Sequence, residues 1–192
     1  MAGRGYTIFD STIGRCGIIW GASGIVAVQL PEAREIETRR RMLRQYADAR
    51  ELRPSRNAGI AIDGIAALLR SQPSDFSDVA LDMRGMPPFN CRVYEVARTI
   101  PRGETVTLAE FARQLGANGA TRAIGQAIGR NPFAILVPCH RVLASDDEAD
   151  RFSINSGTVS QRRLLSLEGA LAKRGPTLFD ALLSVAPPRP QS

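Results

Sequence analysis

Short apolar and polar runs alternate over residues 5–30 in a pattern typical of a small antiparallel sheet. Three of these runs, at residues 6–9, 15–20 and 24–30, are rich in β-branched and aromatic residues, which favour strands. Gly14 and the Gly-Ala-Ser-Gly sequence at 21–24 separate the runs at the spacing of hairpin turns. We therefore expect three strands joined by two tight turns.

Helical spacing replaces this alternation after Pro31, which is suited to open a helix reaching to about Arg50. A second helix is predicted over residues 57–70 and a short strand over 79–81, before Gly85 and the Pro87-Pro88 pair mark a boundary. The first half is thus predicted to be a small α/β scaffold. The positions expected to be apolar and inward are Ile36, Met42, Leu43 and Tyr46 in the first helix, and Ile60, Ile65, Leu68 and Leu69 in the second.

The second half of the chain has a more regular pattern. One helix is predicted from Phe89 to Ile100, and Thr107 with Glu110 matches a capping box at the start of the next helix. Residues 116–119 turn the chain into a further helix that ends near Gly129, and the continuous apolar run at 133–137 predicts a buried strand. The positions expected to be buried in that last helix are Ala120, Ala123, Ile124, Ala127 and Ile128.

Two short helices joined by a glycine-containing turn indicate either a helix-turn-helix or an ordinary helical hairpin, and the pattern alone favours neither. The outer face of the second helix carries cations and little bulk, which favours close approach to a nucleic-acid backbone. Arg122 lies near the helix N-terminus, where the helix dipole also favours phosphate. The outward residues are Thr121, Arg122, Gly125, Gln126 and Arg130.

The length, charge and hydropathy of the chain limit the class of protein but do not identify a binding partner. The chain has 192 residues and a net charge of +6, which is compatible with nucleic-acid binding but is weak support for it. The run Arg39-Arg40-Arg41 fits a solvated helix face better than a phosphate contact, although both are open. No apolar stretch is long enough to span a bilayer, and residues 1–5 lack a signal-peptide core, so a cytoplasmic protein without membrane contact is expected.

Cysteine and histidine content argues against two further classes of site. Cys16, Cys91 and Cys139 are scattered and odd in number, which implies no disulfide framework. A single histidine and the lack of a Cys-x-x-Cys pair make a metal site unexpected. We therefore expect neither metal nor cofactor.

The sequence Pro138-Cys139-His140-Arg141 directly follows the apolar run. Cys139 is either a buried core residue or a nucleophile, and its position beside the only histidine favours the nucleophile. A free thiol has a pKa near ~8.5 and needs activation at neutral pH, which His140 could provide as a base oriented by Glu168. Because neighbouring strand residues point to opposite faces, a direct Cys139–His140 hydrogen bond would need irregular backbone or a bridging water.

Residues 82–169 resemble the O6-alkylguanine-DNA alkyltransferases, or methylated-DNA–protein-cysteine methyltransferases. The resemblance is carried by residues 81–85, 100–106, 122–127, 131–132, 138–142 and 164–169, and the Pro-Cys-His-Arg signature is the most specific of these segments. It implies an α/β fold with a ribonuclease-H-like α/β domain over residues 1–84. A winged helix-turn-helix-like domain for DNA binding and alkyl acceptance would cover 85–172, followed by a tail at 173–192 that is expected to be flexible.

The resemblance also implies a role for each site residue. Cys139 would accept the alkyl group, His140 would be its base through a water, and Glu168 would orient His140. Asn131 would brace the turn before the active site, and Arg122 would enter the duplex in place of the extruded base. Further DNA contacts are expected at Thr121, Gly125, Gln126, Arg130 and Arg141. The implied reaction is an irreversible, single-turnover transfer from O6-alkylguanine in double-stranded DNA to a monomeric protein, with O4-alkylthymine as a further candidate substrate.

Two departures from the family pattern leave the substrate range open. Leu108 stands where the family usually has Tyr, which removes a hydroxyl donor, and the loop 144–157 is acidic and about two residues longer than usual. In that loop Phe152 or Ile154 would supply the pocket's aromatic or apolar wall, and Ser153 or Asn155 its small donor. The expected pocket residues are Leu108, Val142, Phe152, Ser153, Ile154 and Asn155. These departures favour the alternative of a lesion-binding sensor with little or no transfer, whereas a cysteine hydrolase lacks any signal for an oxyanion hole.

Overall fold

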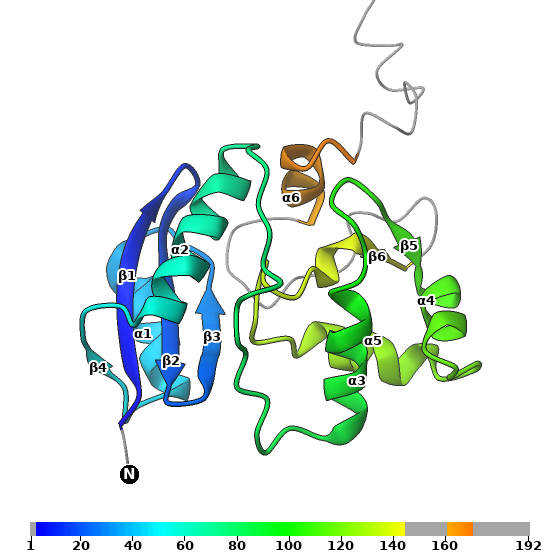
Figure 1. Cartoon of the computed structure of the whole chain (residues 1–192), viewed down its shortest axis with the longest axis horizontal. Coiled ribbons are helices and arrows are strands. Elements are labelled where there is room, and N and C mark those ends of the chain that lie inside the picture. Colours follow the sequence, from blue (N-terminus) through cyan, green and yellow to red (C-terminus); the bar gives the residue numbers. More distant parts are fainter. Residues whose placement is uncertain (1–2, 145–160, 171–192) are drawn as a thin grey trace, which may run out of the picture.

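Residues 3–144 and 161–170 are described by a computed structural model of the chain (Figure 1). Strands β1 (Gly5–Ser11), β2 (Gly14–Gly21) and β3 (Gly24–Gln29) pair antiparallel with their chain neighbours. Strand β4 (Arg50–Glu51) pairs parallel with β1, so the sheet has the order β3-β2-β1-β4. The three predicted strands and their tight turns are confirmed.

Helices cover both faces of this sheet. Figure 1 shows α2 (Arg56–Leu69) in front of the sheet and α1 (Glu35–Gln45) behind it. Ile18 and Trp20 belong to one buried cluster with the inner face of α2, whereas Ile19 belongs to a second cluster with Met42 of α1. Because successive side chains of a strand point to opposite faces, the continuous apolar run of β2 is buried on both sides.

Gly24 allows a second chain segment to run against the edge of β3. Its φ is 143°, and a Cβ built at this position would lie 2.5 Å from the carbonyl oxygen of Ala80. The Ile25 amide donates to that same carbonyl at 2.9 Å, and the Asp82 amide donates to the Ile25 carbonyl at 2.7 Å. Only glycine permits both the positive φ and this close approach.

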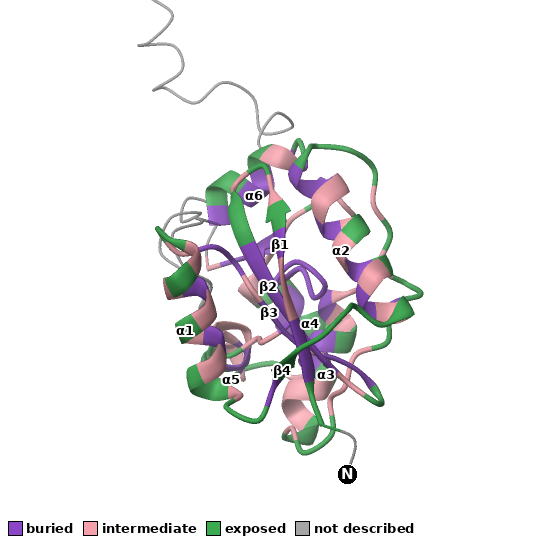
Figure 2. Ribbon diagram, turned by 90° about the vertical axis from the view of Figure 1, so that its left-hand side faces the viewer, coloured by how far each residue is buried: buried purple, intermediate pink, exposed green. Residues whose placement is uncertain are grey.

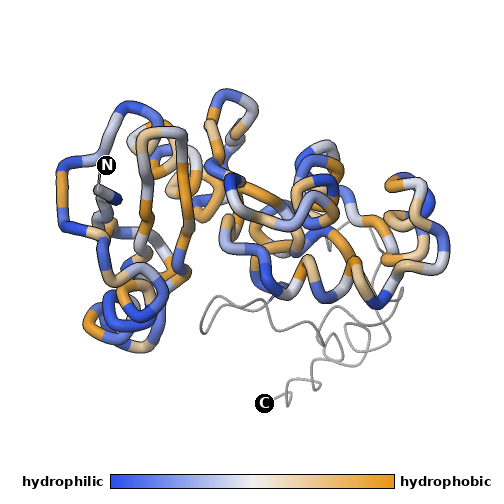
Figure 3. Tube along the Cα trace, turned by 90° about the horizontal axis from the view of Figure 1, so that it is seen from below, coloured by the Kyte–Doolittle hydropathy of each residue, from blue (hydrophilic) through white to orange (hydrophobic). Residues whose placement is uncertain are grey.

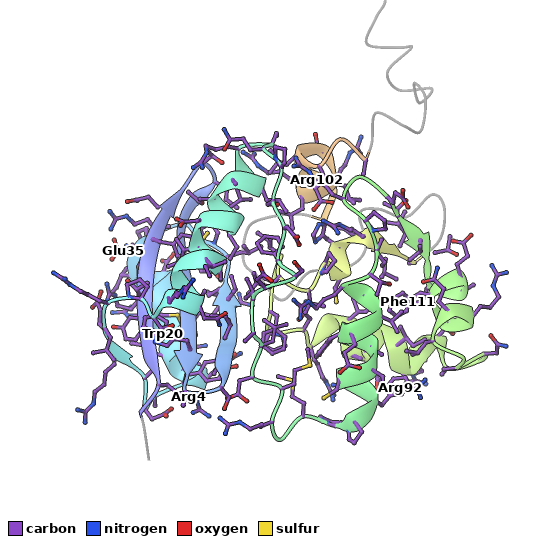
Figure 4. All side chains as sticks on the ribbon, in the orientation of Figure 1. Arg4, Trp20, Glu35, Arg92, Arg102 and Phe111 are labelled. Carbon is purple, nitrogen blue, oxygen red and sulfur yellow. The ribbon has the colours of Figure 1, made fainter. Side chains whose placement is uncertain are left out.

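The second half of the molecule is mainly helical. Its elements are α3 (Pro88–Ala97), β5 (Val106–Thr107), α4 (Leu108–Gln114), α5 (Thr121–Gly129), η1 (Cys139–Arg141), β6 (Val142–Leu143) and α6 (Gln161–Leu167), with β5 and β6 paired in parallel. The predicted capping box of Thr107 and Glu110 is present at the start of α4. Phe111, labelled in Figure 4, is fully buried, and the Tyr94 hydroxyl joins α3 to α5 by donating to the Ala127 carbonyl at 2.9 Å.

One hydrophobic cluster spans the sheet and the helical half. It contains Ile18 and Ile65 from the first half together with Val93, Phe133 and Leu164 from the second. Buried positions follow the strands and the inner helix faces in Figure 2, and the hydrophobic segments of the tube in Figure 3 run through the interior of both halves. The boundary at residue 84 stays a prediction, because the core is continuous across it.

The predicted strand at 133–137 is wrong. Ile135 and Leu136 form a tight turn in which Ile135 has a φ of 71°, and the Val137 amide donates to the Phe133 carbonyl at 2.9 Å. The five residues are all buried, which explains their apolar character. An apolar run reports burial and does not distinguish a strand from a buried loop.

Other element predictions were correct in type but wrong in extent. The helix expected from Pro31 begins only at Glu35, because Arg34 has extended backbone, and it ends at Gln45 rather than near Arg50. Residues 79–81 contribute a single bridge, between Leu81 and Ile25, instead of a strand. The residues that we expected to face inward and that are exposed are Ile36, Ile60 and Ala123. No helix within 3–144 or 161–170 is long and apolar enough to cross a membrane.

Candidate active site and nucleic-acid interface

Cys139 begins the single 3₁₀ turn η1, immediately after the loop that follows α5. Asn131 closes this loop from both ends: its Nδ2 donates to the Val137 carbonyl at 3.0 Å, and its Oδ1 accepts from the Phe133 amide at 2.9 Å. Its side chain also hydrogen-bonds the Cys139 thiol. Asn131 thereby couples the loop geometry to the position of the sulfur.

The surroundings of Cys139 keep its thiol protonated. The residue is 6% exposed. Burial raises the pKa of the Cys139 thiol to about 12, and the hydrogen bond from Asn131 opposes this shift. Desolvation disfavours the thiolate more than the single hydrogen bond favours it. A nucleophilic role therefore requires proton removal during the reaction.

His140 and Arg141 meet on the buried carboxylate of Glu168, which directly follows α6. His140 Nε2 lies 2.9 Å from Glu168 Oε1, and Arg141 donates to both carboxylate oxygens, from Nε at 2.9 Å and from a terminal nitrogen at 2.8 Å. Burial opposes ionisation of Glu168, but the hydrogen bonds from His140 and Arg141 outweigh it and lower its pKa to about 2. The carboxylate is thus charged at neutral pH and, as an acceptor only, takes a hydrogen bond from His140 Nε2–H. In the tautomer that donates this bond, Nδ1 is the ring nitrogen that can accept a proton.

Gln161 is a site residue that the sequence did not reveal. As the first residue of α6, it donates from Nε2 to the carbonyls of His140 at 2.8 Å and Val142 at 3.0 Å. These bonds hold the backbone of η1 and of the residue that follows it. Because both partners are backbone carbonyls about twenty positions earlier in the chain, no side-chain pattern in the sequence signals the contact.

Tyr94 of α3 also lies close to the reactive sulfur. Burial and the nearby Cys139 both raise the pKa of the Tyr94 hydroxyl, so it stays neutral and donates to Ala127. Its ring packs edge-on against Phe133, with centroids 6.1 Å apart. Tyr94 therefore ties α5 to the loop that presents Cys139.

Arg141 does not lie where we expected a DNA contact. It is 8% exposed, and it donates to Glu168 and to the Ile100 carbonyl at 2.5 Å. A buried guanidinium whose donors face a carboxylate and a carbonyl is not available to a phosphate. The burial and the contacts of Arg141 argue against the predicted DNA contact, and they are those of a residue that holds Glu168.

The remaining predicted DNA contacts lie on α5. Arg122, Gln126 and Arg130 are exposed and four residues apart, so they form one stripe along the helix, while Thr121 and Gly125 beside them are half-buried. Among the pocket residues, Leu108 is half-buried at the start of α4 and Val142 is buried in β6. Phe152, Ser153, Ile154 and Asn155 lie outside the described residues, as do most of the acidic loop and the tail at 173–192.

The described residues hold no group of three or more His, Cys, Asp or Glu side chains suited to a metal ion. The chemistry that Cys139, His140 and Glu168 can support is proton transfer by His140, which an ionised carboxylate orients next to a buried thiol.

A sequence model of the 6-O-methylguanine DNA methyltransferase DNA-binding domain matches residues 88–170. Two relatives named methylated-DNA–protein-cysteine methyltransferase extend the match. That of Mycobacterium tuberculosis (strain ATCC 25618 / H37Rv) is 43% identical over 120 residues, which is 62% of this chain and 70% of the relative. That of Methanothermobacter thermautotrophicus is 33% identical over 153 residues, covering 80% of this chain and 78% of the relative.

Solved structures agree with this match over nearly the whole chain. The crystal structure of Mycobacterium tuberculosis O6-methylguanine methyltransferase superposes with a TM-score of 0.69 at 32% identity, covering 93% of this chain and 99% of that one. The crystal structure of Mycobacterium tuberculosis OGT in complex with DNA gives a TM-score of 0.64 at 31% identity, covering 86% and 93%. The fold and site thus define a DNA-repair class of α/β protein. The chain belongs to the methylated-DNA–protein-cysteine methyltransferase family.

Proposed function

We propose that this protein repairs DNA by moving the alkyl group of O6-alkylguanine onto Cys139, once per molecule. The observation that carries the proposal is the arrangement around η1. Asn131 holds the Cys139 thiol, and the adjacent His140 is bonded to an ionised Glu168 that Arg141 also holds. A nucleophile, a base and an oriented carboxylate are the parts that activation of a buried thiol requires.

The proposed reaction balances without a cofactor. The Cys139 sulfur attacks the alkyl carbon, a carbon–sulfur bond forms, and the bond from that carbon to O6 breaks with its electron pair left on guanine. His140 takes the thiol proton through a bridging water, and a proton returns to the guanine ring. Since a thioether is not reversed by water or by any group near the site, each molecule acts once.

Access to the base depends on α5. A base inside a duplex must be extruded before its O6 atom can reach a buried sulfur, at a cost of a few kcal/mol. The exposed stripe of Arg122, Gln126 and Arg130 supplies cations and a polar contact to the backbone, and Arg122 is the side chain we assign to the vacated space in the duplex. The proposed substrate is double-stranded DNA. The protein would bind it as a monomer and act in the cytoplasm.

The mass of the intact protein tests this function. The protein is incubated with a duplex carrying one O6-methylguanine, and its mass is compared with that after incubation with the same duplex carrying guanine. We expect a gain of one methylene unit, located on the Cys139 peptide and absent in Cys139→Ala. A protein that binds the methylated duplex at unchanged mass would contradict the proposal.

Leu108 favours the lesion-binding sensor as a second candidate. It starts α4 at the position where a hydroxyl donor is usual, and it packs against the main core cluster. A relative from Thermus thermophilus, named a DNA base-flipping protein, is 37% identical over 109 residues, which is 57% of this chain and 71% of that protein. Binding without a mass change would support this candidate.

A further inference from the structure

The outward face of α1 carries two arginines that the fold does not use. Arg40 and Arg44 lie one helical turn apart, both are exposed, and neither forms a hydrogen bond or ion pair within the described residues. Arg39, the residue before Arg40, is different: it is bonded to Glu51 at 2.6 Å and to the Tyr6 hydroxyl at 2.8 Å. Of the arginine run, the part that faces solvent is therefore separate from the part that ties α1 to the sheet.

The acidic side chains around these two arginines already form ion pairs with other arginines. Arg40, Arg41 and Arg44 border a surface hollow of about 390 Å³ together with Glu32 and Glu37. Glu32 pairs with Arg41 at 2.7 Å, and Glu37 pairs with Arg34 at 2.6 Å. Arg34, and after it Arg40, lowers the pKa of Glu37. Each of the two acids is thus matched by a cation other than Arg40 or Arg44. The hollow keeps a surplus of positive charge from Arg40 and Arg44.

This surplus lies on the same side of the molecule as α5. Figure 1 shows α1 behind the sheet and α5 behind α3, and Figure 2 shows both helices along one side. Gln45 and Tyr46, at the end of α1, line one cavity of about 240 Å³ with Arg130, which caps the end of α5. The stripe formed by Arg122, Gln126 and Arg130 thus ends beside the C-terminal end of α1. Arg44 lies in the last turn of that helix.

We infer that Arg40 and Arg44 contact the phosphate backbone of the duplex beyond the part held by α5, which extends the DNA footprint onto the N-terminal half. The inference rests on the proposed function, which supplies the duplex. Four helical residues rise about 6 Å, close to the ~7 Å that separates alternate charges of one DNA strand along its axis. Contacts of this kind position a protein on DNA and carry no sequence information. The footprint therefore reaches DNA that flanks the lesion on the α1 side.

A charge-matched pair of variants tests the inference. Arg40→Gln/Arg44→Gln removes two charges from the α1 face, and Arg53→Gln/Arg56→Gln removes two exposed charges at the start of α2, which covers the opposite face of the sheet. Binding to an unmodified duplex of about 24 base pairs, which spans roughly 80 Å, is measured by fluorescence anisotropy across a range of salt concentrations. Thermal unfolding of each variant checks that it is folded.

We expect Arg40→Gln/Arg44→Gln to weaken binding by about tenfold or more near 0.1 M salt and to lower the slope of log K against log salt by about 1 to 2, because each phosphate contact contributes about 0.9 to that slope. The α2 pair should change the slope by less than half as much. Equal losses of affinity in both double variants would mean that only net charge matters, and would overturn the inference. An unchanged salt slope in Arg40→Gln/Arg44→Gln would also overturn it. Failure of the unaltered protein to bind duplex at all would instead count against the proposed function.

Discussion

Glu168 is the residue at which the site and the stability of the fold meet. Its carboxylate has no exposed side-chain surface, and it is bonded to His140 and, at both oxygens, to Arg141. Burying a carboxylate is costly, and the three hydrogen bonds that Glu168 receives, one from His140 and two from Arg141, offset most of its desolvation. Arg141 therefore lets Glu168 stay ionised while it orients His140.

The low pKa of Glu168 predicts an acid-sensitive contribution to stability. Its pKa falls from an ordinary 4.5 to about 2 in the folded protein. Because the folded value is the lower one, the stabilisation is complete above pH 4.5 and is lost as the pH falls towards 2. The shift corresponds to about 3 kcal/mol of unfolding free energy.

Urea unfolding of the unaltered protein and of Glu168→Gln, from pH 6 to pH 2, measures this contribution. The advantage of the unaltered protein over Glu168→Gln should shrink by about 3 kcal/mol across that range. A difference between the two proteins that does not depend on pH would contradict the assignment of an ionised Glu168.

The edge of β3 is the element that connects the N-terminal sheet to the active site. The Val28 amide donates to the Pro132 carbonyl at 2.8 Å, one residue after Asn131. Val28 and Phe133 form a parallel bridge, so the loop before Cys139 is bonded to the sheet edge. The N-terminal half thereby takes part in holding Asn131, and through it the sulfur.

Val28→Pro removes this donor while keeping an extended backbone at a strand edge. We expect a loss of about 1–3 kcal/mol in unfolding free energy. We also expect a slower reaction of Cys139 with a free O6-alkylguanine base, which is measured from the mass of the protein. Val28→Ala, which keeps the amide, is the matched control. A rate in Val28→Pro equal to that of Val28→Ala would show that the bond does not position Cys139.

Helices, strands and turns were predicted correctly where their signal is local in the sequence, and missed where it depends on distant contacts. The capping box at Thr107 and Glu110 was correct because both partners are local in the chain. The strand predicted at 133–137 was wrong because burial makes a loop as apolar as a strand. Gln161 was missed, and the contacts of Arg141 with Glu168 and Ile100 were not foreseen, because their partners come from distant segments that only the folded chain brings together.

At the scale of the whole molecule, the residues proposed for DNA binding lie at the surface and those proposed for alkyl transfer lie in the interior. The α5 stripe faces solvent, whereas Cys139, His140 and Glu168 are buried. Arg102, labelled in Figure 4, links two distant chain segments by donating to the carbonyl of Gln72 and, at 3.2 Å, to that of Leu167. Loss of a DNA contact should therefore affect repair of a duplex more than reaction with a free base.

Arg122→Ala tests this separation. Rates of Cys139 alkylation are measured with an O6-methylguanine duplex and with a free alkylguanine base. The loss with the duplex should exceed the loss with the base by at least about tenfold, because the extruded base is no longer replaced in the stack. Equal losses with the two substrates would refute the role assigned to Arg122.

The central claim is that each molecule transfers one alkyl group to Cys139 and then stops. Its most direct test is a titration in which a fixed amount of protein meets increasing O6-methylguanine duplex, and repaired guanine and alkylated Cys139 are counted in the same sample. We expect both quantities to rise together and to level off at one per protein molecule. Repair that continues beyond one lesion per molecule, or a methylated duplex that is bound but never repaired, would contradict it.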